Sequence, residues 1–336
     1  MASQPLYDVI IGGAGPAGLA AGLYAARDRY KTLLLERNGL PGGQILLTEH
    51  VENYPGYVKI GGFELVEQMK QQVLRFGAEL AVNKSVDAIT RQADGTLVLS
   101  VNRGKAAYQA RAVILALGSD YRQLGVPGES QMRQAGKVSY CATCDGAFFR
   151  DKHVLTVGGG NTAVEDAVYL ATRFAKKTTV IHRREEFRAQ KVIVEELYAA
   201  AKSHDVDIKL PYVLDAIIPT PDKAAIDHAL IRHVNTGATE TLAVDGVFIF
   251  VGMNPNTGWL KGLLPVDANG YVPADPRTMK TAVPGVFIAG DCRQGADMQL
   301  VAACADGVAA ALQLKAHFRD GGAWSADLES DEPGNW

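Results

Sequence analysis

Two glycine-rich turns limit the possible folds of this chain more than any other feature of its sequence. The first turn, Gly13-Ala-Gly15-Pro-Ala-Gly18, follows an apolar run and precedes an alanine- and leucine-rich stretch typical of a helix. The second turn, Gly158-Gly-Gly160-Asn-Thr-Ala163, has the same surroundings. A strand, a glycine turn and a helix in this order begin a dinucleotide-binding βαβ unit. The repeat therefore predicts an α/β fold with two Rossmann-like dinucleotide-binding domains.

The residues that end the second strand of each repeat differ in charge. After the first turn this strand stops on Glu36, whose carboxylate can bind the hydroxyls of a ribose. After the second turn the strand is followed by His182, Arg183 and Arg184, with Arg188 a few residues further on. Guanidinium groups bind a 2′-phosphate, which a carboxylate would repel. The first site is thus predicted to take FAD or NAD, and the second site NADP.

The arginine cluster has a second interpretation. Glu185 and Glu186 interrupt it, so the three arginines could form one face of a solvated helix. Their position relative to the glycine turn favours nucleotide binding, because the ribose of a bound dinucleotide lies at the end of the second strand.

Two further apolar strands that end in glycine indicate how the repeats are connected. They end at Gly118 and Gly252, and we interpret both places as crossings between domains. The first domain would be discontinuous, comprising residues 1–117 and 250–336. Residues 118–249 would form the second domain, inserted into the first.

A third apolar strand, near the end of the chain, closes on Gly290 and Asp291. The glycine lets backbone approach a ligand, and the carboxylate can accept hydrogen bonds from a polyol, although such a pair is also common in ordinary turns. A helix is expected over 300–317. The acidic segment after it, from about residue 318, is expected to be a mobile tail.

A CxxC pair, Cys141 and Cys144, precedes the second glycine turn. Structural zinc usually needs a second ligand pair, and neither Cys292 nor Cys304 lies in a CxxC or near a histidine pair, so no metal site is predicted. We favour a redox-active dithiol over a pair of inert buried thiols. The other two cysteines are expected to be structural. Asp145 could protonate a departing thiolate if burial raises its pKa, or it could cap a helix.

The composition excludes several other classes of protein. The chain has 336 residues, a formal charge of −3 and four cysteines. This charge gives no basic surface for nucleic acid, and four cysteines are too few for a disulfide scaffold. The start lacks the features of a signal peptide, and no apolar run is long enough to span a bilayer. We therefore expect a cytoplasmic protein with no nucleic-acid or membrane partner.

Taken in order, the motifs resemble those of the low-molecular-weight, bacterial-type thioredoxin reductases, which are class II pyridine nucleotide-disulfide oxidoreductases. The match runs from about residue 5 to residue 317. Its most specific part is Cys141-Ala-Thr-Cys144-Asp145-Gly146 followed by the second glycine turn. The other matching motifs are the first glycine turn, Glu36, Gly42-Gly43-Gln44, Glu52-Asn53-Tyr54-Pro55-Gly56, Ala116-Leu-Gly118, the arginine cluster and Gly290-Asp291.

The resemblance implies an enzyme in which NADPH reduces FAD, the flavin reduces the CxxC disulfide, and the dithiol reduces thioredoxin. It implies that the outer domain binds FAD, that the inserted domain binds NADPH, and that the protein is a homodimer. The FAD contacts implied by position are Gly13, Gly15, Pro16, Ala17, Gly18, Glu36, Gly43, Gln44, Asn53, Gly118, Gly290, Asp291 and Gln299. The implied NADPH contacts are Gly158, Gly160, Asn161, Thr162, Ala163, His182, Arg183, Arg184 and Arg188. The implied catalytic residues are Cys141, Cys144 and Asp145.

The chain departs from the family pattern at two places. Met298 stands where the family often has arginine, and Leu46-Leu47 lie in a stretch that is often polar. These departures concern how the flavin is tuned and leave the reaction class unchanged. The alternative function is a related flavin-dependent disulfide oxidoreductase or dithiol oxidase that acts on a different substrate. A flavin-bound redox sensor is a non-enzymatic alternative, which a complete NADP site disfavours because such a site indicates turnover.

Overall fold

The computed structural model describes residues 5–48 and 51–321 and divides the chain into two compact units. Unit 1 comprises Met1–Asp120 and Asn254–Trp336, and unit 2 comprises Tyr121–Met253. The sequence analysis predicted that the chain crosses between the two domains after residues 117 and 249. In the structure the chain crosses along β7 (Ser119–Tyr121) and β16 (Met253–Pro255), which pair as a two-stranded sheet. Most of the expected acidic tail, residues 322–336, lies outside the described residues.

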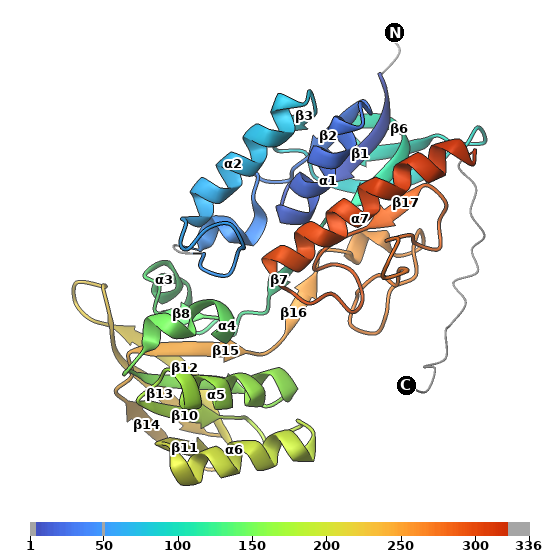
Figure 1. Cartoon of the computed structure of the whole chain (residues 1–336). Helices are drawn as coiled ribbons and strands as arrows, with labels where there is room; N and C mark the ends of the chain where they lie inside the picture. The colour runs from blue at the N-terminus through green and yellow to red at the C-terminus, as the bar shows by residue number, and fades with distance from the viewer. Residues whose placement is uncertain (1–4, 49–50, 322–336) are drawn as a thin grey trace. The chain divides into compact units, whose positions relative to one another are not determined.

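Unit 1 is built around a seven-stranded sheet (Figure 1). Its order is β3-β2-β1-β6-β5-β4, and β17 also pairs with β6. Strands β1, β2, β3, β6 and β17 are parallel, whereas β5 and β4 extend the sheet in antiparallel fashion. The strands are β1 (Leu6–Gly12), β2 (Thr32–Leu35), β3 (Glu79–Ala81), β4 (Val86–Arg91), β5 (Leu97–Val101), β6 (Ala106–Leu115) and β17 (Val286–Ile288). The strand order reverses direction beside β1, and α/β sheets bind ligands at the carboxyl end of such a switch point.

The central strands of this sheet are buried on both faces. On β1, Val9 and Ile11 pack into a core shared with α1, α2 and α7, whereas Ile10 packs into the core on the opposite face. This explains the apolar runs at residues 9–11 of β1, 33–35 of β2 and 112–115 of β6. Helices α1 and α7 lie side by side, and a Cβ on Gly307 would lie 2.0 Å from the Ala17 carbonyl oxygen (Figure 1). The helices are α1 (Pro16–Arg27), α2 (Gly62–Arg75) and α7 (Leu300–Arg319), with short 3-10 helices η1 (Gly43–Leu47) and η3 (Gly258–Leu260).

Unit 2 contains a parallel five-stranded sheet in the order β11-β10-β9-β15-β8 and a separate antiparallel sheet, β12-β13-β14. The strands are β8 (Val138–Ser139), β9 (His153–Gly158), β10 (Lys177–Ile181), β11 (Val206–Lys209), β12 (Tyr212–Pro219), β13 (Ile226–His233), β14 (Thr239–Leu242) and β15 (Gly246–Phe250). The helices are α3 (Glu129–Gln134), α4 (Ala142–Asp145), η2 (Gly146–Phe149), α5 (Asn161–Arg173) and α6 (Lys191–Ser203). Strand β9, its glycine turn and α5 repeat the plan of β1 and α1, which confirms the predicted α/β fold class.

The structure bears on two further expectations, the length of the last helix and the presence of membrane-spanning helices. Helix α7 continues to Arg319, slightly beyond the expected end at His317. Across residues 5–48 and 51–321, no helix is both long and apolar enough to cross a membrane.

Candidate functional site

The first glycine turn joins the carboxyl end of β1 to the N-terminus of α1. A Cβ on Gly13 would lie 2.2 Å from the Ala116 carbonyl oxygen, and one on Gly18 would lie 1.9 Å from the Gly13 carbonyl oxygen. Backbone packs directly against backbone at both positions, so both require glycine. A Cβ on Gly15 would meet only the Cα of Gly43, 3.9 Å away. The middle glycine therefore leaves bare backbone at a helix N-terminus, where a pyrophosphate binds in dinucleotide folds.

Other predicted backbone positions lie around this turn. Pro16 and Ala17 form the first turn of α1, where a proline costs no helix hydrogen bond. Gly43 faces Gly15 from the start of η1. Gly118 follows β6, the strand beside β1, and has no atom within 4 Å of its Cβ position. Bare backbone from three segments thus borders the carboxyl end of the sheet.

Glu36 directly follows β2 and is buried. Its two carboxylate oxygens accept hydrogen bonds from the backbone N–H groups of Ala14 and Asn38, each at 2.9 Å. Because Ala14 belongs to the glycine turn, the carboxylate is held beside that turn. Each oxygen keeps a second lone pair, so the group can still accept hydrogen bonds from ribose hydroxyls.

A chain of contacts connects the predicted polar side chains of unit 1. The Asn53 amide donates to the Gln299 side chain, with an Nδ2–Oε1 distance of 3.4 Å. The Gln44 amide donates to the Ser119 carbonyl, and the Ser119 hydroxyl lies 3.9 Å from the sulfur of Met298. The structure thus brings together residues that are widely separated in the sequence. Met298, where the sequence departs from the family pattern, lies within this chain of contacts.

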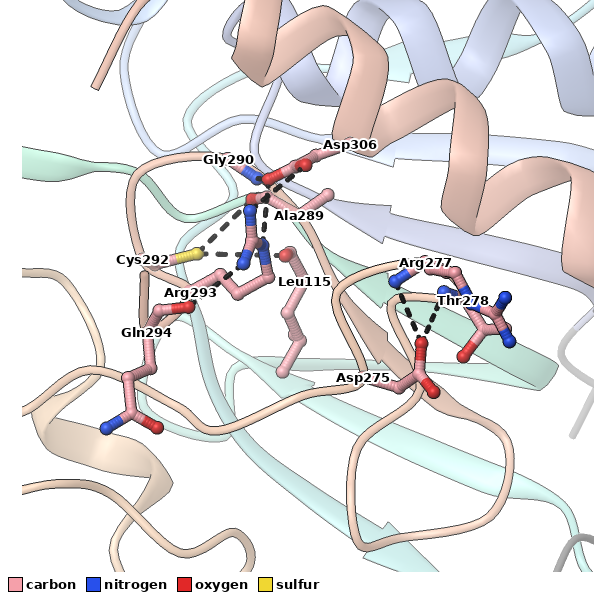
Figure 2. Close-up of polar contacts among 10 residues, drawn as sticks. All are labelled: Leu115, Asp275, Arg277, Thr278, Ala289, Gly290, Cys292, Arg293, Gln294 and Asp306. Atoms are coloured by element: carbon pink, nitrogen blue, oxygen red, sulfur yellow. Dashed lines mark hydrogen bonds and ion pairs between the residues drawn. The ribbon is translucent and has the colours of Figure 1, made fainter. Parts of the chain in front are cut away.

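A buried ion pair holds the Gly290–Asp291 loop in place (Figure 2). The Asp306 carboxylate on α7 accepts a hydrogen bond from the Gly290 N–H at 3.1 Å. It also accepts two from the Arg293 guanidinium, at 3.0 and 3.3 Å. A Cβ on Gly290 would lie 2.9 Å from the Cβ of Ala17, so the loop lies against the start of α1. The ion pair therefore fixes the loop beside the first glycine turn.

Asp291 is largely shielded from water in this loop. Burial and the neighbouring Asp306 charge raise the pKa of Asp291 to about 6. Hydrogen bonds from a bound polyol would favour its charged form.

The pair of Arg293 and Asp306 was not predicted from the sequence, because their pairing depends on how α7 packs. The signal available in the sequence was that Asp306 is the one charged residue in the otherwise apolar run 300–312.

The second glycine turn joins β9 to α5 and likewise combines two closely packed glycines with one open glycine. A Cβ on Gly158 would lie 2.4 Å from the Phe250 carbonyl oxygen, and one on Gly159 would lie 2.3 Å from Nδ1 of His182. Gly160 has no atom within 4 Å of its Cβ position, so bare backbone again lies at a helix N-terminus. The first turn of α5 is formed by the remaining predicted residues, Asn161, Thr162 and Ala163.

His182 is buried against this turn. Its Nε2 atom has no hydrogen-bond partner among the described residues. Burial lowers the pKa of His182, and the charges of Arg188, Arg183 and Arg184 lower it further, so the ring is neutral at neutral pH. Buried polar atoms in native proteins normally have a partner. This orphaned nitrogen beside open backbone fits a site that a polar ligand completes.

Arg183, Arg184 and Arg188 lie on a loop, defined here as residues 183–189 and called the arginine loop. All three side chains are exposed, and within the described part of the chain none of them forms an ion pair. Residues 183–186 are bends, and α6 begins only at Lys191, so the alternative of a helix face is wrong. The backbone N–H groups of Arg188 and Ala189 donate to the Gly159 carbonyl at 2.7 and 3.2 Å. The loop therefore folds back onto the second glycine turn.

Cys141 and Cys144 form a disulfide, with a Cα–Cα distance of 5.3 Å. Cys141 is the N-cap of α4, and its sulfur accepts a hydrogen bond from the Cys144 N–H at 3.2 Å. The Thr143 hydroxyl lies 3.3 Å from the same sulfur. These sulfurs are bonded to each other, and over the ranges that the structure describes no cluster of histidine, cysteine and acidic residues could hold a metal ion. The geometry fits dithiol–disulfide chemistry.

Asp145 ends α4, directly after Cys144. Burial raises the pKa of Asp145, while a 2.6 Å hydrogen bond from the Ser139 hydroxyl and the charge of Arg133 partly oppose this rise. The Ser139 oxygen also accepts a hydrogen bond from the Cys141 N–H at 3.1 Å, so it links the acid to the disulfide. Sequence reasoning missed Ser139 because a serine two residues before a CxxC carries no signal of its own.

A second acid connects α4, which lies at the disulfide, to α5. Asp166 lies on α5, and its carboxylate accepts a hydrogen bond from the Ala142 N–H. Burial raises the pKa of Asp166 to about 6 despite this bond. Sequence reasoning did not identify this residue either, because the contact depends on the packing of α4 against α5.

The two other cysteines are free thiols. Cys292 is buried and Cys304 is half-buried. Burial raises the pKa of Cys292 to about 12 and that of Cys304 to about 11. Both groups are therefore protonated at neutral pH, and a thiol is a much poorer nucleophile than a thiolate.

Comparisons with known proteins agree with this geometry. Residues 7–307 match the family described as pyridine nucleotide-disulphide oxidoreductase. A thioredoxin reductase of Bacillus subtilis is 40% identical over 95% of this chain and 97% of its own length. Another, of Treponema pallidum, is 43% identical over 91% of this chain and 95% of its own length. The crystal structure of thioredoxin reductase from Streptococcus pyogenes has a TM-score of 0.86 at 42% identity, covering 95% of this chain and 100% of that chain.

Proposed function

Since the chain belongs to the pyridine nucleotide-disulphide oxidoreductase family, we propose that it is a thioredoxin reductase that uses NADPH and FAD. Electrons would pass from NADPH through FAD and the Cys141–Cys144 disulfide to oxidised thioredoxin. The observation that carries this proposal is in unit 2. There the CxxC disulfide, a glycine turn and three arginines follow the strands β8, β9 and β10 of one parallel sheet. The three arginines have no carboxylate partner in the described structure. Curated relatives with the name thioredoxin reductase support the choice of substrate.

We assign FAD to unit 1, which would make it the FAD-binding domain. The bare backbone of Gly15, Gly43 and Gly118 leaves space for a pyrophosphate and its neighbouring groups. Glu36 would accept hydrogen bonds from the adenosine ribose, and Asp291 would accept them from the ribityl chain. The other proposed FAD contacts are Gly13, Pro16, Ala17, Gly18, Gln44, Asn53, Gly290 and Gln299.

We assign NADPH to unit 2, which would make it the NADPH-binding domain. Arg183, Arg184 and Arg188 would bind the 2′-phosphate, because they are exposed cations beside the glycine turn. The neutral ring of His182 would contribute its orphaned Nε2 atom. The other proposed NADPH contacts are Gly158, Gly160, Asn161, Thr162 and Ala163.

The chemistry on this chain's own residues is the opening and closing of one S–S bond. Reduction of the Cys141–Cys144 disulfide takes up two electrons and, at completion, two protons. FAD, when bound, supplies the two-electron chemistry that connects a nicotinamide to a disulfide. Asp145 would deliver a proton to a departing thiolate, because its raised pKa keeps it protonated at higher pH than an ordinary aspartate. One thiolate then attacks the disulfide of thioredoxin, and the second displaces the product and restores the S–S bond.

The test of this function is NADPH consumption with and without oxidised thioredoxin. We expect sustained consumption only when thioredoxin is present, and none when thioredoxin has been reduced and alkylated beforehand. Oxygen uptake that is driven by a small dithiol, with no NADPH consumed and no dependence on thioredoxin, would favour the dithiol-oxidase alternative. A single reduction event without turnover would favour the redox sensor.

The cofactor, the oligomeric state and the cellular location of the proposed enzyme can each be measured separately. Chromatography of the released cofactor should identify FAD. Light scattering on the eluting holoenzyme should give the mass of a homodimer, which is proposed from the resemblance. Fractionation of cells should place the protein in the cytoplasm.

A further inference from the structure

The arginine loop carries carboxylates that could neutralise its own arginines. Glu185 directly follows Arg184 and lies three residues before Arg188. Side chains this close in sequence on an exposed loop can form ion pairs, and a carboxylate paired with a guanidinium competes with a phosphate for the same N–H groups. Yet in the described structure none of the three arginines of the loop is ion-paired.

A neighbouring side chain accounts for the position of Glu185. Its Oε1 atom accepts a hydrogen bond from the side-chain amide of Asn235, with an Nδ2–Oε1 distance of 2.9 Å. Asn235 lies in the turn between β13 and β14, far from Glu185 in the sequence. A neutral amide satisfies this carboxylate without adding a charge to the loop.

The turn that carries Asn235 is itself well defined. His233 is its anchor, because its carbonyl accepts from the Gly237 N–H at 2.9 Å and its N–H donates to the Ala238 carbonyl at 2.8 Å. The Nδ1 atom of His233 lies 3.3 Å from the backbone nitrogens of both Asn235 and Thr236. The His233 ring packs edge-on against Tyr212, with 5.0 Å between ring centroids. These contacts order the backbone of the turn from which the Asn235 side chain projects.

The same turn is tied by backbone to the start of the arginine loop. The Val234 N–H donates to the Pro211 carbonyl at 2.9 Å, and the Tyr212 N–H donates to the His182 carbonyl at 2.8 Å. His182 directly precedes Arg183. Two backbone hydrogen bonds therefore hold the backbone of this turn close to the start of the arginine loop.

We propose that Asn235 is a positioning residue for coenzyme specificity, which holds the Glu185 carboxylate away from the arginine loop so that its guanidinium groups stay free for a 2′-phosphate. This inference rests on the NADPH site proposed above. Asn235 itself need not touch the nucleotide. Its loss would let Glu185 pair with Arg184 or Arg188, and the phosphate would then have to displace that carboxylate. The ligand affected is any nucleotide with a 2′-phosphate, whereas nucleotides without it would bind as before.

The test measures binding of 2′,5′-ADP and of 5′-ADP to the holoenzyme by calorimetry, with no turnover involved. We expect Asn235→Ala to raise the Kd for 2′,5′-ADP about twofold to fivefold, the effect of one exposed ion pair. The Kd for 5′-ADP should not change. Adding Glu185→Gln to this variant should restore the wild-type Kd, because a neutral side chain no longer competes with phosphate. Thr236→Ala is the matched control, since it alters the same turn without a contact to Glu185.

The rescue separates positioning from simple loss of structure. A damaged turn would weaken both ligands, and Glu185→Gln would not repair it. The inference is overturned if Asn235→Ala binds 2′,5′-ADP as the wild type does, or if the double variant stays weak. If wild-type protein bound 2′,5′-ADP no better than 5′-ADP, the NADPH assignment itself would fail, and this inference with it. A preference in the wild type that is unchanged in Asn235→Ala would refute only the role of Asn235.

Discussion

The buried pair of Arg293 and Asp306 gives a prediction whose size can be worked out from its contacts. Asp306→Asn keeps the side-chain volume but removes the charge opposite a guanidinium that stays protonated at any practical pH. Arg293 and Asp306 are only 8% and 9% exposed, so water cannot replace the lost partner. Removing one partner of a buried pair typically costs about 3–5 kcal/mol. We expect that loss in the free energy of unfolding, together with weaker flavin binding, because the Gly290 N–H loses its charged acceptor.

The assay is urea unfolding of the apoprotein followed by circular dichroism, with flavin affinity measured separately by fluorescence quenching. Replacing both partners, with Arg293→Met and Asp306→Leu, should recover most of the stability, since no buried charge then lacks a partner. Flavin binding should stay weak in this double variant. Asp320→Asn, which breaks the exposed pair with Arg319, is the control and should leave stability close to that of the wild type. A loss below about 1 kcal/mol in Asp306→Asn, or a double variant as unstable as the single one, would refute the reasoning.

Three further predictions concern the NADPH site and the disulfide. Replacing Arg183 alone by alanine should raise the KM for NADPH about tenfold to a hundredfold, because one charge-assisted contact contributes ~1.5–3 kcal/mol, and replacing Arg184 as well should raise it further. The KM for NADH should stay nearly unchanged in both variants; equal losses for both coenzymes would place the 2′-phosphate elsewhere. Ser139→Ala removes a hydrogen bond that favours charged Asp145, so the pKa of this acid should rise further. The alkaline limb of the thioredoxin half-reaction should then move to higher pH, and a shift in the opposite direction would contradict the proton-donor role. After reduction of the native protein, iodoacetamide at neutral pH should label the CxxC pair and spare the other two cysteines, which mass spectrometry can check.

The repeated glycine turns were sufficient to predict the fold class. Each turn has two glycines that pack closely against other atoms and one that is open; in the first turn these are Gly13, Gly18 and the open Gly15. Such close approach admits few residues other than glycine, so the constraint is visible in the sequence. The resemblance to thioredoxin reductases, which rested on these turns and the CxxC, is confirmed by the comparisons.

The residues that support the site were not predictable in the same way. Asp306, Ser139 and Asn235 each act through a single hydrogen-bonding group that reaches a partner on another element. Many side chains could occupy such positions, and only the packing of the elements shows which pairs meet. The arginine loop illustrates the same limit, because its mixed charges left a helix face open as an alternative, whereas hydrogen bonds to Gly159 give the loop a different path.

The central claim is that electrons reach thioredoxin through the Cys141–Cys144 disulfide, and an anaerobic flavin spectrum tests it most directly. The wild-type holoenzyme takes four electrons, two on FAD and two on the disulfide, so it is reduced with two equivalents of NADPH, whereas each serine variant is reduced with one; excess oxidised thioredoxin is then added. In the wild type we expect the flavin absorbance to bleach and then return. In Cys141→Ser and in Cys144→Ser it should bleach in the same way, because both glycine turns are intact, but thioredoxin should not restore it. Recovery of the flavin by thioredoxin in either serine variant would contradict the account, because electrons would then have a route that bypasses this disulfide.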